Sequence, residues 1–192
     1  MKKQLIKKNK GFTLVETLFA VFILTFTIAS LMTVVANNLF AAKYARDEIT
    51  VNYLLQEVVD YIRNDRDTTV FLGNGTTWND FVLKYENCSG SNGCYLDVLE
   101  ALKEINLATI NTEPCSISDG CLFLYYNKDA DITSGSFYNY NTNNVQTNFR
   151  RKIIVKPDIL NPDEIDVTVT IDWKNGGKNM TRSLSTNLMK WQ

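Results

Sequence analysis

The side chains of this chain that could do chemistry are few and unevenly placed. The 192 residues include no histidine, which removes the commonest general base and metal ligand. The sequence contains no phosphate-binding glycine loop, no dinucleotide-binding fingerprint and no nucleophile paired with a base. Residues 12–192 carry 15 basic and 21 acidic groups, so nucleic-acid binding is not expected. We expect neither an enzyme nor a bound cofactor.

The four cysteines form two pairs of identical spacing. They lie in "CSGSNGC", from Cys88 to Cys94, and "CSISDGC", from Cys115 to Cys121. Structural zinc sites usually have two to four residues between paired ligands, so a metal site is disfavoured. An even number of cysteines in an exported chain indicates disulfides, with free buried thiols as the alternative. Of the three possible connectivities we favour the two local pairs, because Ser, Asn, Asp and Gly in each loop allow a tight turn.

One acidic stretch, "NKDADITSG", resembles the start of a calcium-binding loop. It places Asn127, Asp129 and Asp131 at alternating positions. The EF-hand pattern requires glycine at its sixth position and glutamate at its twelfth, where this chain has Ile132 and Tyr138. We therefore expect a solvated hairpin loop, with a calcium site as the weaker alternative.

A single carboxylate, Glu16, interrupts an otherwise uncharged apolar segment, residues 12–36. Residues 17–36 alone would span about 30 Å as a helix, the thickness of a hydrocarbon core. The apolar side chains contribute roughly −4 to −8 kcal/mol to insertion, whereas a carboxylate costs about 2.5–3.5 kcal/mol at the centre and less near the end. The segment is predicted to insert, with the five lysines of residues 1–11 keeping its amino end in the cytoplasm.

Three interpretations of this segment compete. A secretory signal would have a shorter apolar core followed by a small-x-small cleavage site, and no Ala-x-Ala follows here as far as Ala45. A plain membrane anchor leaves Gly11 and Glu16 without a role. The sequence "KGFTLVE", residues 10–16, resembles the processing site of type IV prepilins and pseudopilins, and this interpretation accounts for both residues. The resemblance is close over about the first forty residues.

The resemblance implies that a prepilin peptidase and N-methyltransferase cuts between Gly11 and Phe12 and methylates the new terminus. Glu16 then falls at the fifth position of the mature chain, where this family keeps a glutamate. Cleavage creates an ammonium at Phe12, and Glu16 of a neighbouring subunit, or of the same subunit before assembly, can neutralise it. The alternative is a capping box, Thr13-x-x-Glu16, in which the glutamate bonds back to the start of the helix.

The helical pattern continues past the membrane segment. Apolar residues recur at the i, i+3, i+4, i+7 spacing of an amphipathic helix, at Val51, Leu54, Leu55, Val58, Val59 and Ile62. No proline precedes Pro114, so one unkinked helix is expected from Phe12 to about Arg63. We divide the chain into a cleaved leader (1–11), a transmembrane and assembly helix (12–36), an amphipathic helix (37–66) and a β-rich globular domain (67–192).

The carboxyl-terminal half is predicted to be an antiparallel sheet. Apolar and polar residues alternate in "EIDVTVTIDW", and "KNGGK" predicts a turn into "MTRSLSTNLMKW". Further strands are predicted in "CLFLYY", on both sides of the Asn/Thr-rich turn of "FYNYNTNNVQTNFRRKIIV", in "WNDFVLKY" and at residues 95–99. The expected fold class is α+β, with a long amino-terminal helix packed on the sheet, as the resemblance to pilins also implies.

The resemblance implies a structural subunit of a type IV pilus-like or type II secretion pseudopilus filament. The unkinked helix and the large disulfide-containing domain favour a pseudopilin or a minor pilin. The implied partners are the prepilin peptidase, other pilin or pseudopilin subunits, an inner-membrane assembly platform and membrane lipid. The precursor would span the bacterial inner membrane once, with its globular domain outside the cytoplasm. The alternative is an uncleaved, membrane-anchored extracytoplasmic receptor domain.

Overall fold

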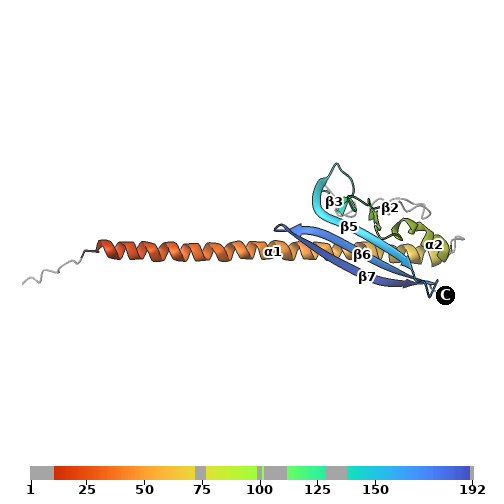
Figure 1. Ribbon diagram of the computed structural model, residues 1–192, viewed down its shortest axis with the longest axis horizontal. Coiled ribbons are helices and arrows are strands. Elements are labelled where there is room, and N and C mark those ends of the chain that lie inside the picture. The colour runs from red at the N-terminus through yellow and green to blue at the C-terminus, as the bar shows by residue number, and fades with distance from the viewer. Residues whose placement is uncertain (1–10, 72–76, 99–100, 102–111, 129–137, 191–192) are drawn as a thin grey trace, which may run out of the picture. The chain divides into compact units, whose positions relative to one another are not determined.

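A computed structural model describes residues 11–71, 77–98, 101, 112–128 and 138–190 (Figure 1). The chain divides into two compact units, Met1–Arg46 and Asp47–Gln192. Helix α1 (Leu14–Phe71) begins in the first unit and ends in the second. The second unit also contains helix α2 (Trp78–Lys84), the short 3-10 helix η1 (Glu86–Cys88) and a sheet of seven strands.

In the first unit, α1 exposes large apolar side chains on every side. Among them are Phe22, Ile23 and Leu31, whose exposed fractions lie between 57 and 64%. In the described part of the chain α1 is the one helix that is long and apolar enough to cross a membrane. Such a surface is unfavourable in water, because removing this much apolar area from solvent lowers the free energy of the system.

The sheet of the second unit is antiparallel and is organised around its longest strand. Its strands are β1 (Cys94–Leu96), β2 (Thr112–Pro114), β3 (Phe123–Tyr126), β4 (Tyr138–Asn139), β5 (Val145–Pro157), β6 (Glu164–Asn175) and β7 (Lys178–Met189). One edge of β5 pairs with β3 and then with β1, which carry β4 and β2. The other edge pairs with β6, and β6 pairs with β7.

Strands β6 and β7 form the hairpin that the alternating sequence predicts. They pair without a register shift from Glu164↔Met189 to Asn175↔Lys178. The two residues between them, Gly176 and Gly177, have φ angles of 57° and 81°. A two-residue hairpin turn of this hand requires positive φ at both positions, which glycine adopts without steric cost.

The core of the second unit lies between α1 and the inner face of the sheet. The predicted apolar stripe of α1 is buried, with Val51, Val58 and Ile62 at 0% exposure. Alternate residues of the strands are equally buried: Ile153, Val155, Ile165, Val167, Val169 and Ile171. This confirms the predicted α+β fold, in which the helix packs on an antiparallel sheet.

The prediction of a strand in "WNDFVLKY" is wrong, because these residues form helix α2. Thr77 is the N-cap: its Oγ1 accepts from the backbone N–H of Asp80 (3.4 Å), and its own N–H donates to the Asp80 carboxylate (2.6 Å). Trp78 and Phe81 lie one turn apart and are both buried. This capping box and helical spacing were visible in the sequence, but the aromatic residues also fit a strand.

Two further elements differ in length from the predictions. Helix α1 ends at Phe71 and not near Arg63, because buried polar residues, including Asp65 and Thr69, extend its inward face beyond the last apolar position. Strand β1 ends at Leu96, whereas the prediction ran to Leu99, which lies outside the described residues. The apolar stripe alone therefore underestimates the length of the helix.

Candidate processing and assembly site

The residues of the predicted cleavage site precede the first turn of α1. Gly11, Phe12 and Thr13 are non-helical and exposed, and the helix begins at Leu14. A Cβ added at Gly11 would have no atom within 4 Å. The fold therefore gives no steric reason for glycine at this position.

Glu16 lies in the first turn of α1, and its backbone is capped by Thr13. The N–H of Glu16 donates to the Thr13 carbonyl (3.0 Å) and more weakly to Thr13 Oγ1 (3.4 Å). Within the described residues the Glu16 carboxylate receives no hydrogen bond from the Thr13 N–H, in contrast to Asp80 and Thr77. Only half of the capping box is formed, so capping does not explain the carboxylate.

The hydroxyl groups within the apolar part of α1 are satisfied by the helix itself. Each donates to the carbonyl three residues earlier, at 2.7–2.9 Å: Thr17, Thr25, Thr27, Ser30 and Thr33. A hydroxyl without a partner in hydrocarbon would cost several kcal/mol, and these bonds remove most of that cost. The segment is thus compatible with lipid at every polar position except the carboxylate of Glu16.

The cysteines form the two local disulfides that we favoured. Cys88 pairs with Cys94 and Cys115 with Cys121, with Cα–Cα distances of 4.6 and 4.4 Å. In the first loop Gly93 has a φ of 65°, and a Cβ at this position would lie 2.5 Å from the carbonyl oxygen of Ile153. The first disulfide loop therefore lies directly against the central strand β5.

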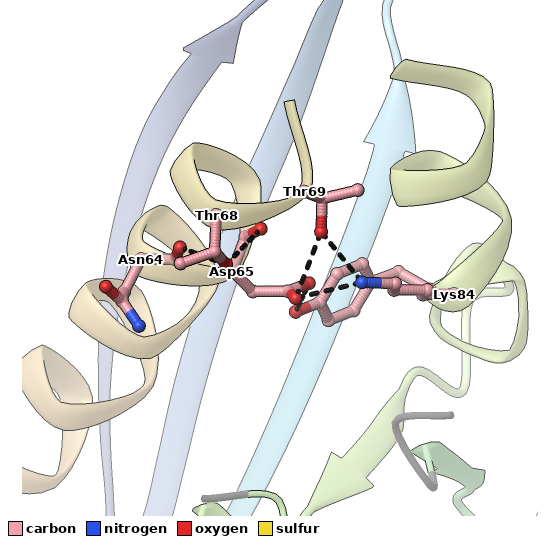
Figure 2. A network of polar contacts seen from close by, with 6 residues as sticks. Asn64, Asp65, Thr68, Thr69 and Lys84 are labelled. Carbon is pink, nitrogen blue, oxygen red and sulfur yellow. Dashed lines mark hydrogen bonds and ion pairs between the residues drawn. The ribbon is translucent and has the colours of Figure 1, made fainter. Parts of the chain in front are cut away.

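A buried polar cluster fixes the end of α1 to α2 (Figure 2). The ammonium of Lys84 contacts the Asp65 carboxylate (3.0 Å) and Thr69 Oγ1 (2.8 Å), and the Tyr85 hydroxyl donates to the other oxygen of Asp65 (3.0 Å). Burial, and then the Asp65 carboxylate, raise the pKa of Tyr85 well above its ordinary value. The ion pair was not predicted, although Asp65 lies three residues after Ile62 on the buried face.

A second buried ion pair joins the middle of α1 to β5. The side chain of Arg151 is 1% exposed, and its Nη1 donates to Glu57 (2.8 Å) while Nη2 donates to the Leu96 carbonyl (3.0 Å). Burial lowers the pKa of this guanidinium, but Tyr140 and Glu57 outweigh that effect and raise it. The alternation of "NFRRKIIV" places Arg151 on the inner face. This alternation is the sequence signal that could have indicated that Arg151 is buried.

The predicted calcium loop is only partly described. Asn127 follows β3, whereas Asp129 and Asp131 lie outside the described residues. Among the residues that the structure describes, no group of three or more Asp, Glu, Cys or His side chains could hold a metal ion. The calcium alternative therefore gains no support from the described geometry.

Comparison with known proteins identifies the amino-terminal segment. A family model for the prokaryotic N-terminal methylation motif matches residues 6–32, which include Gly11, Phe12 and Glu16. No curated protein and no solved structure matches the chain. The motif implies processing by a prepilin peptidase, and together with the apolar helix it suggests a membrane-anchored precursor. Residues 6–32 are therefore similar to the prepilin-type N-terminal methylation motif, and they lead into a long helix whose second part packs on an antiparallel sheet.

Proposed function

We propose that the chain is a structural subunit of a pilus-like or secretion pseudopilus filament, made as a precursor and cut after Gly11. The observation that supports this most is the carboxylate of Glu16. It is exposed on the apolar first part of α1, it lies within the methylation motif, and the described residues of its own chain give the carboxylate no partner. A carboxylate in that position is favourable beside the N-terminus of the helix, and a cation that reaches it in lipid would remove the cost of its charge.

Cleavage supplies that cation. Hydrolysis of the bond after Gly11 leaves an ammonium on Phe12, and N-methylation keeps its positive charge. In a medium of low dielectric constant an unpaired charge is strongly disfavoured, so the ammonium of one subunit and Glu16 of a neighbour gain by pairing. The pair would set the axial position of each subunit relative to the next.

The helix face that carries Glu16 also suits close packing. Ala20, Thr27, Ser30 and Ala41 follow Glu16 on the same face at helical spacing, with the larger Ile23 and Val34 between them. Small side chains allow helices to approach closely in lipid, where the hydrophobic effect gives no net drive for association. The first unit therefore provides both a contact surface and a charge that fixes its register.

Mass spectrometry of the mature chain tests the proposal. We expect loss of residues 1–11 and a methyl group on Phe12 when the chain is made with an active prepilin peptidase. The variant Gly11→Val should keep its leader and still fold, since a side chain at Gly11 meets no other atom. An intact leader on the unmodified sequence would instead favour the uncleaved receptor domain.

A further inference from the structure

Two adjacent aliphatic side chains, Ile159 and Leu160, lie almost wholly in solvent. They belong to the loop between β5 and β6, residues 158–163, and are 98% and 93% exposed. Single exposed apolar side chains are common on proteins, but two adjacent ones at the tip of an ordered loop indicate a contact with something else. We call this pair the apolar knob.

The loop that carries the apolar knob is held by its own hydrogen bonds. The N–H of Leu160 donates to Asp158 Oδ1 (2.7 Å), the N–H of Asp158 donates to the Glu164 carbonyl (2.9 Å), and the N–H of Glu164 donates to the Asn161 carbonyl (3.0 Å). The knob is therefore presented in one fixed conformation. Docking it costs less conformational entropy than ordering a free loop would.

The same loop is anchored to two other parts of the second unit. The indole Nε1 of Trp78, on α2, donates to the Pro162 carbonyl (2.9 Å). The N–H of Lys190, after β7, donates to the Asp163 carbonyl (2.8 Å). These bonds leave Ile159 and Leu160 exposed although the chain on both sides of them is fixed.

Acidic residues surround the apolar knob. Residues 158–166 contain Asp158, Asp163, Glu164 and Asp166 and no basic residue. Lys190 forms an ion pair with Asp163 (3.4 Å), whereas Asp158 forms none among the described residues. An anionic lipid surface would repel this segment. A suitable occupant is instead an apolar cleft with basic side chains at its rim.

The same chain has such a cleft beside the second disulfide loop, Cys115–Cys121. A cleft of about 330 Å³ is lined by Tyr95, Leu122, Phe123, Tyr125 and Arg150, among others. Its volume lies within the range of protein binding pockets, about 300–1,000 Å³. Leu122 is 51% exposed at this site, and Tyr95 and Tyr125 are half-buried. We call it the aromatic cleft.

Arg150 makes the rim of the aromatic cleft basic. Its guanidinium stacks over the Phe123 ring (4.0 Å from the carbon to the ring centre), and Nη1 donates to the Asp119 carbonyl (2.7 Å). Lys152 lies beside it and lines an adjoining hollow of about 230 Å³ together with Arg150. Among the described residues no carboxylate forms an ion pair with Arg150.

Two carboxylates near the rim already have donors. Oδ2 of Asp119 accepts from the Ser118 hydroxyl (2.8 Å), and Oδ1 of Asp172 accepts from the Thr181 hydroxyl (2.6 Å). Asp172 lies across from Arg150 on β6, but among the described residues neither carboxylate forms an ion pair with its guanidinium. Arg150 thus remains available to a carboxylate from another molecule.

We propose that the apolar knob of one copy docks in the aromatic cleft of a second copy, with Asp158 facing Arg150. The inference rests on the proposed function, because subunits must lie side by side for the contact to form. A contact between two different patches is heterologous and generates an open chain of subunits, as a filament requires. It predicts that copies of this chain lie next to one another in the filament.

Mixed cysteine variants of the full chain test the contact. Leu160→Cys is placed on one tagged copy and Leu122→Cys on a second, and both are made in cells that assemble the filament. All four native cysteines are paired, so any new interchain disulfide reports the introduced pair. We expect the disulfide in the mixture and its loss when either variant is made alone. A disulfide in the Leu160→Cys chain alone would overturn the heterologous contact.

A second variant distinguishes this inference from the proposed function. Ile159→Asp should fold and be processed normally, because the side chain of Ile159 is 98% exposed. Introduced beside Leu160→Cys, it should abolish the interchain disulfide. Filaments that contain the processed chain but no disulfide between the Leu160→Cys and Leu122→Cys chains would refute the contact between knob and cleft. They would leave the proposed filament function intact. If photo-crosslinking from position 160 reaches lipid or a different subunit, the second copy is the wrong occupant. Failure to be processed or assembled would refute both proposals.

Discussion

The two parts of α1 differ in what surrounds their apolar side chains. In the first unit Phe22 and Ile23 are 63% and 57% exposed, whereas in the second unit Val58 and Ile62 are fully buried. The apolar side chains of one continuous helix thus have two different surroundings. The chain's own sheet covers the second part, whereas the first part is exposed and, under the proposed function, is covered by lipid or another subunit.

Two acidic side chains of α1, Asp65 and Glu16, show the same contrast. Asp65, in the second part, is 4% exposed and has Lys84 and Tyr85 as partners. Glu16, in the first part, is exposed, and its carboxylate has no partner among the described residues. Substitutions in the first part should therefore affect assembly, and substitutions in the second part should affect the stability of the domain.

The largest expected effect on stability comes from Asp65→Ala. It leaves the Lys84 ammonium buried without a counter-charge, and breaking a buried pair in this way costs about 3–5 kcal/mol. Denaturant unfolding of the full chain in detergent, followed by tryptophan fluorescence, measures it, since Trp78 and Trp173 are buried in the domain. Glu16→Ala is the matched control: we expect an unchanged unfolding free energy, normal processing and no filament. Normal incorporation of Glu16→Ala into filaments would contradict the proposed pairing.

A pair of isoleucines sharpens the comparison. Ile62→Ala should destabilise the domain by about 2–5 kcal/mol, because it removes apolar atoms and leaves a cavity in the core. Ile23→Ala, in the first part of the same helix, should leave the unfolding free energy of the domain unchanged. The same fluorescence measurement serves both variants. Equal losses would mean that the two parts of α1 unfold as one cooperative element.

Much of this fold could be predicted from local patterns in the sequence. The stripe from Val51 to Ile62 and the alternation in β6 encode burial directly, because helix and strand periods differ. The methylation motif was equally visible, since its residues lie within a few positions of one another. Each of these signals depends on neighbours in the sequence and not on the tertiary structure.

The contacts that were missed depend on residues far apart in the sequence. Asp65 meets Lys84, and Arg151 meets Glu57, only after α2 and β5 have packed on α1. Helix α2 was predicted as a strand because the segment is short and aromatic residues such as Trp78 and Phe81 are common in strands. Two features make this segment helical: the hydrogen bonds of its N-cap and its packing against the core. The packing depends on tertiary structure and cannot be read from neighbouring residues.

A smaller effect is expected where a helix begins. Thr77→Ala removes the hydroxyl that caps α2 and should cost about 0.5–2 kcal/mol, whereas Thr77→Ser should retain most of the stability. Thr13→Ala, at the start of α1 in the first unit, should not change the unfolding free energy of the domain. Denaturant midpoints for the three variants test this, and a loss with Thr13→Ala would contradict the separation of the two parts.

The smallest effect is a titration at the surface of the second unit. Partial burial and the hydrogen bond to Glu113 raise the pKa of the Tyr95 hydroxyl to about 12, above the ordinary value near 10. Because the folded state holds this proton more tightly, its contribution to stability is present below pH 10 and is lost as the pH rises from 10 through about 12. Absorbance of tyrosinate at alkaline pH should show the Tyr95 transition, identified as the difference from Tyr95→Phe. In Glu113→Gln that transition should move towards pH 10, since the carboxylate no longer opposes ionisation. An unchanged transition would mean that burial alone raises the pKa.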